Sequence, residues 1–140
     1  MVDLKKTLKE KGLKPTPHRI QILSLFYQSQ EPLSAEEIFK HCQGYRRLNL
    51  STVYRTLETL KSGGIIRSLN FEGEDRTLYE LKQRHTHYLK CLGCKKILPV
   101  DFCPLGDMDT ISKSQNFQIT EHRLDMYGYC QDCKDQSAHS

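Results

Sequence analysis

The chain has 140 residues, of which 37% are hydrophobic and 27% charged, which is enough for one ordinary domain or two small ones. It holds no apolar run of the roughly 18 residues that a transmembrane helix needs, and its N-terminus is charged from the third residue, so we expect neither a membrane span nor a secretory signal. The sequence therefore predicts a cytoplasmic protein. Its six cysteines then indicate metal binding, because disulfides are rare in that compartment.

The formal net charge of +4 is unevenly distributed along the chain. Residues 1–70 hold 12 Lys and Arg against 6 Asp and Glu, whereas residues 83–140 hold 7 of each kind. A basic first half and a neutral second half favour a polyanion as the partner of the first half. On charge alone, a surface that only keeps the protein in solution is an equally open explanation.

Apolar residues recur at helical spacing in four stretches of the first half. The expected helices cover residues 3–11, residues 17–28, a segment that begins after Ser34, and residues 51–62. Thr16 is expected to cap the second helix, and Ser34 with Glu37 has the capping-box spacing. Asn49 or Ser51 is expected to cap the fourth helix, which Gly63 ends.

Two β-like runs follow, over residues 65–70 and 76–81, joined by a polar turn. Helices followed by a hairpin within about 80 residues form the plan of a winged helix-turn-helix domain, in which the helix over residues 51–62 enters the major groove. Four apolar residues of that helix are expected to face the core: Leu50, Val53, Leu57 and Leu60. The opposite face is expected to carry Thr52, Tyr54, Arg55, Thr56 and Thr59.

Several side chains of this half are candidates for contact with double-stranded DNA. On the recognition helix, Arg55 suits a guanine edge or a phosphate, and Tyr54 suits a phosphate or a thymine methyl, with Ser51 and Thr52 beside them. The candidate contacts to the DNA backbone are Lys14, Arg19, Arg46, Arg47, Lys61 and Arg67. An ordinary solvated helix surface is the alternative, and the wing and the charge asymmetry favour DNA.

The second half changes character. We expect strands over residues 86–91 and 95–101, a helix that opens at Pro104 and reaches about residue 115, and one long strand or a strand pair over residues 117–129. The sequence thus predicts an α+β protein. Its parts are an N-terminal winged helix-turn-helix domain over residues 1–81 and a small zinc-stapled α/β domain over residues 82–140.

Two Cys-x-x-Cys turns, Cys91 to Cys94 and Cys130 to Cys133, supply two thiolates each. Together they complete a tetrahedral site of the structural kind, which suits zinc. Because the second domain is short and its core is thin, a metal there would contribute directly to folding. A single pair could be a redox dithiol, whereas a matched pair favours zinc.

A second set of ligand-type residues lies outside these turns: His85, His87, Cys103 and His122. His85 and His87 are two positions apart on an expected strand and share one face. Imidazoles with one soft thiolate suit a second zinc site. On spacing alone, a surface role for His122 and a buried apolar role for Cys103 stay open. Cys42, on the inner face of a helix, is expected in the core.

The sequence shows no nucleophile–base pattern, phosphate loop or dinucleotide fingerprint. We therefore expect neither an enzyme nor a small-molecule substrate.

Taken together, the chain resembles the ferric uptake regulator (Fur) superfamily from Leu4 to Cys133. The matching segments are residues 12–19, 34–39, 51–57, 85–94 and 121–130. The resemblance implies a winged-helix domain, a dimerisation domain and a metal-driven hinge, in a homodimeric repressor of AT-rich palindromic operators. It gives Tyr54 and Arg55 the DNA-reading positions and Lys14 that of a minor-groove lysine.

Departures from the family pattern affect the sensed metal. At the usual hinge site, the family's ligand positions hold Pro32 or Glu31, Thr86, Tyr88 and Pro99, and only Glu80 fits. His85 and His87 instead lie six and four residues before Cys91, which is the spacing of ligands in the family's inter-domain site. The fourth ligand of that site matches His122. Cys103, followed by Pro104 and Leu105, resembles an element of zinc-uptake regulators (Zur).

We therefore expect a zinc-sensing repressor of metal-uptake genes that acts as a metallated homodimer on operator DNA, with a structural zinc and a second regulatory divalent metal, for which zinc is favoured. An iron or peroxide sensor of the same fold, with Glu80 joining His85 and His87 in a shifted register, is the first alternative. A zinc-stapled thiol redox protein and an architectural DNA-binding protein without a metal response are alternatives from other classes.

Overall fold

The computed structural model of the chain describes residues 2–43, 48–84, 86–106 and 108–137. The chain divides into two compact units, Met1–Arg84 and His85–Ser140, and each is described by itself. Three candidate residues, Arg46, Arg47 and His85, lie outside the described residues. None of the helices found in the described ranges is both long and apolar enough to cross a membrane.

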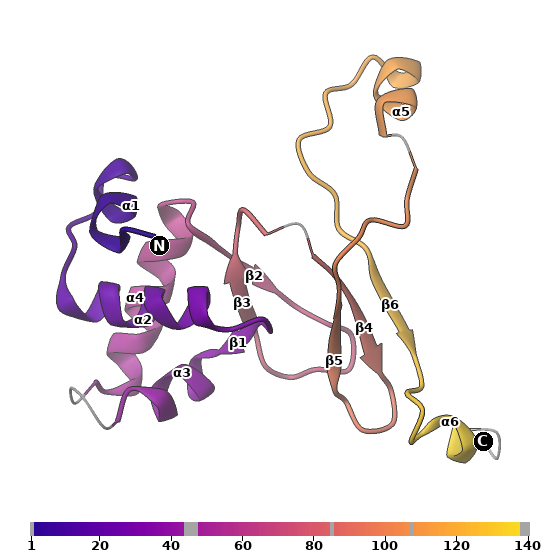
Figure 1. The fold of residues 1–140 in the computed structure, drawn as a ribbon, viewed down its shortest axis with the longest axis horizontal. Helices are drawn as coiled ribbons and strands as arrows, with labels where there is room; N and C mark the ends of the chain where they lie inside the picture. The colour runs from indigo at the N-terminus through magenta and orange to yellow at the C-terminus, as the bar shows by residue number, and fades with distance from the viewer. Residues whose placement is uncertain (1, 44–47, 85, 107, 138–140) are drawn as a thin grey trace. The chain divides into compact units, whose positions relative to one another are not determined.

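Figure 1 shows the helices of the first unit, and they begin where the sequence places their caps. They are α1 (Leu4–Glu10), α2 (Pro17–Gln28), α3 (Ala35–His41) and α4 (Leu50–Ser62). Thr16 caps α2, and Ser34 and Glu37 form both hydrogen bonds of a capping box on α3. Asn49, rather than Ser51, caps α4 and accepts a 2.7 Å hydrogen bond from the Thr52 amide. Side-chain oxygens thus satisfy amides that have no partner within the helix.

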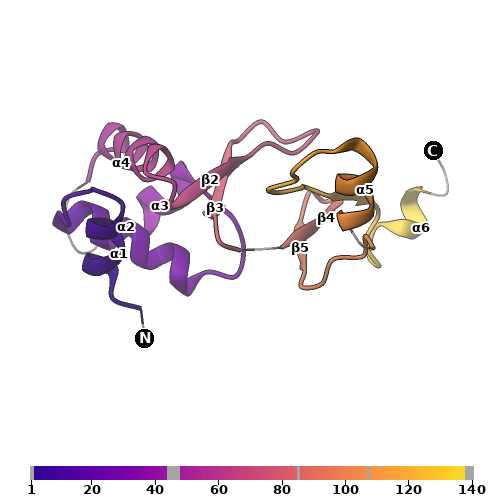
Figure 2. The same ribbon diagram turned by 90° about the horizontal axis from the view of Figure 1, so that it is seen from above.

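An antiparallel sheet completes this unit. It consists of β1 (Leu33–Ser34), β2 (Ile66–Leu69) and β3 (Leu78–Leu81) in the order β1-β3-β2. Figure 2 shows β2 and β3 leaving the helices as one extended hairpin, which is the wing. The wing was predicted, whereas β1, which pairs with β3 at Leu33 and Tyr79, was not.

The hydrophobic core of the first unit lies between the helices and this sheet. Val53, Leu57 and Leu60 of α4 are fully buried, and so is Cys42, as predicted. Two predictions for α4 were wrong: Leu50 is 36% exposed, and Thr56 is buried. The reason is helical geometry, because Thr56 completes the i, i+3, i+4, i+7 stripe that starts at Val53, and Leu50 lies in the first turn, outside the packed region.

The second unit is built on a three-stranded sheet in the order β5-β4-β6. Its elements are β4 (His87–Cys91), β5 (Ile97–Val100), α5 (Met108–Gln115), β6 (Asp125–Gly128) and α6 (Lys134–Ser137). β5 is antiparallel to β4, and β6 is parallel to it, with Cys91 opposite Gly128. Two segments distant in sequence therefore run side by side in the same direction.

Two predictions in this unit were wrong. The helix begins at Met108, not at Pro104, and Pro104–Gly106 is irregular, since glycine disfavours a helix interior. Of residues 117–129, only Asp125–Gly128 forms a strand. Asp125 pairs with Tyr88, next to the first residue of β4. The strand β4 therefore does not extend far enough to pair with the residues before Asp125. Cys103 and His122 consequently lie in irregular segments.

Candidate functional site

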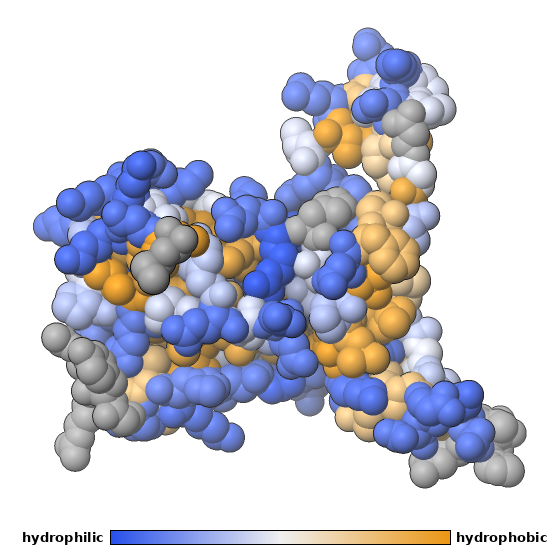
Figure 3. All heavy atoms as spheres, in the orientation of Figure 1, coloured by the Kyte–Doolittle hydropathy of each residue, from blue (hydrophilic) through white to orange (hydrophobic). Residues whose placement is uncertain are grey.

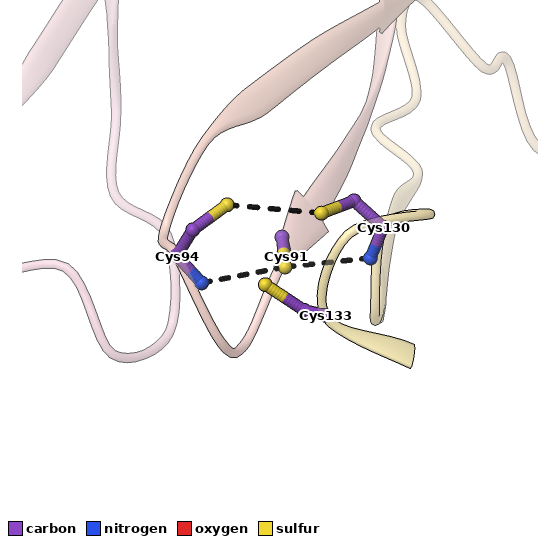
Figure 4. A group of neighbouring side chains, drawn as sticks. All are labelled: Cys91, Cys94, Cys130 and Cys133. Carbon is purple, nitrogen blue, oxygen red and sulfur yellow. Dashed lines mark hydrogen bonds between the residues drawn. The ribbon is translucent and has the colours of Figure 1, made fainter. Parts of the chain in front are cut away.

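The two Cys-x-x-Cys turns meet at one end of the second sheet. Cys91 ends β4, and Cys130 follows β6. Because these strands are parallel, their last residues lie at the same end of the sheet. The sulfur atoms of Cys91, Cys94, Cys130 and Cys133 all lie within 4.8 Å of one another. Figure 4 shows the four side chains converging, with Cys94 Sγ 3.8 Å from Cys130 Sγ. Four thiolate-forming groups around one point fit a tetrahedral zinc ion.

Backbone amides stabilise a thiolate at Cys91. The amides of Cys94 and Cys130 each donate to Cys91 Sγ at 3.4 Å, and mainly for this reason the pKa of Cys91 falls to about 5. Hydrogen bonds to Cys130 and Cys91 instead raise the pKa of Cys133 to about 12. The cluster therefore shares protons among its sulfurs, and a bound cation would replace them, as metal sites of thiolates require.

Gly93 is a functional position that the sequence interpretation missed. A Cβ atom placed on Gly93 would lie 2.9 Å from both Cβ and Sγ of Cys133. A Cβ atom essentially never lies within 3.0 Å of an atom outside its own residue and the two adjacent ones. Only glycine therefore lets the two turns meet at this distance. The glycine inside the Cys-x-x-Cys turn was the available signal.

A second group of ligand atoms lies elsewhere in the same unit. Among the residues that the structure describes, His87, Cys103 and His122 bring one ligand atom each within 4.8 Å of the others. Cys103 Sγ lies 3.3 Å from His122 Nε2, and the rings of His87 and His122 stack with centroids 5.1 Å apart. His87 is only 2% exposed. The structure thus assembles three of the four expected ligands, while His85 lies outside the described residues.

Glu80, the additional candidate ligand, belongs to the first unit and is 2% exposed. It accepts a 2.8 Å hydrogen bond from Arg67 Nε, and Arg67 Nη2 also donates to the Arg84 carbonyl at 2.9 Å. An internal cation therefore neutralises this carboxylate. Arg67 was a candidate DNA contact, and its guanidinium is instead engaged within the unit.

The candidate DNA-binding residues of α4 lie on its exposed side. Ser51 and Arg55 are exposed, Thr52 is half-buried, and Tyr54 is 42% exposed. Arg55 Nη2 donates to Thr52 Oγ1 at 3.3 Å. At the connection between α1 and α2, Lys14 is exposed and half-buried Arg19 donates to the Lys14 carbonyl at 3.1 Å.

Glu36 of α3 is a second residue that the sequence interpretation missed at a candidate site. Its carboxylate accepts a 2.8 Å hydrogen bond from the Tyr54 hydroxyl. The capping box marked Glu36 only as a first-turn residue of α3, and no local pattern relates it to a tyrosine 18 residues away.

A helical unit with a β-hairpin wing, joined to a unit with two clusters of metal-ligand atoms, defines a metal-binding protein of the winged-helix class. Residues 10–127 match the Ferric uptake regulator family, and the chain belongs to this family of metal-responsive transcriptional regulators. Members of the family regulate transcription and are not enzymes.

Known members of the family match nearly the whole chain. The ferric uptake regulation protein of Yersinia pestis is 36% identical, over 100% of this chain and 99% of the relative. The peroxide operon regulator of Bacillus subtilis is 27% identical, over 95% and 92%. The crystal structure of the Vibrio cholerae ferric uptake regulator superposes with a TM-score of 0.72 at 33% identity, over 91% of this chain and 100% of that one.

Proposed function

We propose that the chain is a zinc-responsive repressor of the Zur kind, which binds operator DNA as a metallated homodimer in the cytoplasm and controls metal-uptake genes. One observation carries the choice of metal: Cys103 Sγ lies 3.3 Å from His122 Nε2, in one group with His87. A thiolate among imidazoles favours zinc over ferrous iron, whereas oxygen ligands favour harder ions. His85, two residues before His87, is the fourth ligand in this proposal.

The four-cysteine site has a different role in this proposal. A structural zinc at Cys91, Cys94, Cys130 and Cys133 stabilises the domain over residues 82–140. The supporting observation is that both turns lie at the same end of the paired strands β4 and β6, so one ion joins segments that are far apart in sequence. This site is closed by four protein ligands, as structural zinc sites are.

The domain over residues 1–81 binds DNA through α4. Ser51, Thr52, Tyr54 and Arg55 present hydroxyl and guanidinium groups suited to base edges and phosphates. Lys14 and Arg19 add positive charge outside this helix, in the half of the chain that carries the excess of Lys and Arg. The hinge between the domains makes this binding depend on metal.

A homodimer is supported by apolar side chains exposed on the second sheet. Leu89 is 40% exposed, and Leu98, which pairs with it across β4 and β5, is 41% exposed on the same face. Figure 3 shows apolar surface over this sheet. Burial of such a surface against a second copy is favourable, and contiguous apolar patches typically mark interaction sites.

The regulatory step follows from differential binding. Zinc at the His87, Cys103 and His122 group, all of which belong to the second unit, joins two irregular segments of that unit and thereby shifts a population in which these segments already meet. In the dimer, that arrangement sets the two α4 helices at the spacing of successive major grooves. The metal-free dimer has lower operator affinity, and uptake genes are transcribed.

An iron- or peroxide-sensing regulator is the second candidate. The observation that favours it is the similarity to relatives named for ferric uptake regulation and for a peroxide operon. The pairing of Glu80 with Arg67 counts against an oxygen-rich site that includes Glu80.

The test is operator binding, measured by fluorescence anisotropy with buffered free zinc and, separately, with ferrous iron under anaerobic conditions. We expect affinity to rise steeply with zinc at very low free concentration. A response to iron alone would assign the protein to the iron or peroxide sensors and reject zinc sensing.

A further inference from the structure

The surface proposed to meet DNA contains one carboxylate hydrogen-bonded to a DNA-reading side chain. The Tyr54 hydroxyl on α4 donates to Glu36 Oε1 on α3 at 2.8 Å. Both side chains are exposed, so this contact is not a feature of the core. A negative charge at a polyanion interface normally weakens binding, and its presence there calls for a compensating role.

The proton of this hydrogen bond stays on the tyrosine at neutral pH. The hydrogen bond from Tyr54 is the main cause that lowers the pKa of Glu36, and the same bond is the main cause that raises the pKa of Tyr54. A phenol has a single proton to donate, and Tyr54 donates this one to the hydrogen bond with Glu36. The Glu36 carboxylate also accepts hydrogen bonds from its own backbone amide and from the Ser34 side chain. The tyrosine oxygen and the carboxylate oxygens consequently offer acceptors, and no donor, to a third group.

A pair of groups that can only accept hydrogen bonds binds only a DNA group that donates one. Phosphate oxygens, guanine O6 and N7, and thymine O4 are acceptors themselves and have no proton to offer. In the major groove, donors are the exocyclic amino groups of cytosine (N4) and adenine (N6). The other candidate DNA contacts Lys14, Arg19 and Arg55 are all donors, and they are suited to phosphates and guanine edges.

We propose that Glu36 and Tyr54 together form an acceptor-only edge that recognises an exocyclic amino group of cytosine or adenine in the major groove. The inference rests on the proposed role of α4 as the recognition helix. It differs from the phosphate contact expected for Tyr54 from the sequence, and it leaves the aromatic ring free to touch a neighbouring thymine methyl. Glu36 acts both through its own oxygen and by positioning the tyrosine hydroxyl.

The experiment is selection from a pool of short duplexes of randomised sequence by the zinc-loaded protein. We expect one position in each half-site at which the wild type prefers cytosine or adenine by roughly tenfold, the discrimination typical of a good base contact. Which base is enriched distinguishes the two sources of the amino group. Glu36→Ala and Tyr54→Phe should lose this preference and leave the rest of the selected sequence unchanged.

Two further variants sharpen the test. Glu36→Gln keeps an acceptor for Tyr54 but adds an amide donor, so it should admit thymine or guanine at the same position. Glu58→Gln removes an exposed carboxylate from α4 itself and should select the same sequence as the wild type. Circular dichroism checks that all variants are folded.

Deletion of the amino group from the DNA gives an independent measurement. In the selected duplex, the adenine is replaced by purine or the cytosine by 2-pyrimidinone. Wild-type affinity should fall roughly tenfold, whereas Glu36→Ala should bind both duplexes equally. Unchanged selection by Glu36→Ala would overturn the inference. Tighter binding of every duplex by this variant, with a steeper salt dependence, would also overturn it, because Glu36 would then lie against a phosphate. If the wild type selects no sequence, the proposed function fails as well.

Discussion

Cys103 Sγ and His122 Nε2 lie 3.3 Å apart although the two residues are 19 positions apart in sequence. Neither residue belongs to a helix or strand, so no regular element fixes this distance. Two irregular segments meet at a pair of ligand-type atoms next to the buried imidazole of His87. This is the arrangement that a regulatory metal would strengthen.

Replacement of Cys103 by serine should weaken regulatory zinc binding and leave the protein folded. We expect zinc affinity to fall at least about tenfold, because the loss of even a residue that only supports a metal ligand typically costs about 10- to 100-fold. The preference for zinc over manganese should narrow, because the soft ligand is gone. Competition with a zinc chelator measures both effects.

The matched control for this change is His41→Gln, which alters an exposed histidine of α3 and should preserve zinc affinity. An unchanged zinc response in Cys103→Ser would exclude Cys103 as a ligand.

Substitution of Gly93 by alanine should prevent the four cysteines from closing around one ion. The new Cβ would lie 2.9 Å from Cβ and Sγ of Cys133, so the second turn would have to move away. Gly128→Ala is the control, because a Cβ there meets nothing within 4 Å. Metal content after purification and thermal melting should separate the two variants. Equal metal content and equal melting temperatures would show that the turns adjust without cost.

Removal of the structural metal, or Cys94→Ser, should unfold the second unit while the first unit stays folded. The structural site would supply folding free energy that the thin core of this unit lacks, and the first unit has its own core. Hydrogen exchange should show lost protection of the Cys94 and Cys130 amides, which donate to Cys91 Sγ. Amides within α2 and α4 should stay protected. A folded, dimeric Cys94→Ser protein would contradict the structural role of the site.

Arg67→Ala should destabilise the first unit more than Arg76→Ala does. Arg67 pairs with the buried Glu80 carboxylate, and the loss of one partner leaves a buried charge. We expect a cost of about 2–3 kcal/mol, below the range for fully buried pairs because Arg67 is partly exposed. Arg76 is itself exposed and pairs with exposed Glu37 and with Glu74, whose side chain is 10% exposed, so its loss should cost about 1 kcal/mol.

Urea denaturation monitored by circular dichroism gives the free energies of unfolding of both variants. Equal losses of stability would mean that the Arg67–Glu80 pair contributes no more than a surface ion pair.

Local chemistry made the first unit predictable. Thr16, Ser34 and Asn49 act over three residues, and their hydrogen bonds form wherever the chain enters a helix. The apolar period of α4 similarly predicted its buried face. Thr56 was misplaced because its side chain is polar, although the period, rather than polarity, decides which positions pack against the core.

Tertiary contacts decided the features that could not be predicted. β1 consists of two residues, and its strand identity depends on a partner near residue 79. Residues 117–124 have β-like character, but the pairing of Asp125 with Tyr88 leaves them without a neighbouring strand. The bond from Tyr54 to Glu36 depends on how α3 packs against α4. The spacing of residues in the sequence does not indicate any of these tertiary contacts.

The parallel pairing of β4 and β6 has a consequence for how the two metal sites affect each other. An ion held by Cys91, Cys94, Cys130 and Cys133 would convert the chain between the two turns into a closed ring, and Cys103 and His122 both belong to that ring. Ring closure restricts the open ensemble and so reduces the entropy that must be lost when these two residues meet. The first ion thus raises the effective concentration of one regulatory ligand at the other. An ion at the four-cysteine site would therefore raise the zinc affinity of the group that contains Cys103 and His122, and zinc at that group would strengthen the four-cysteine site by the same factor.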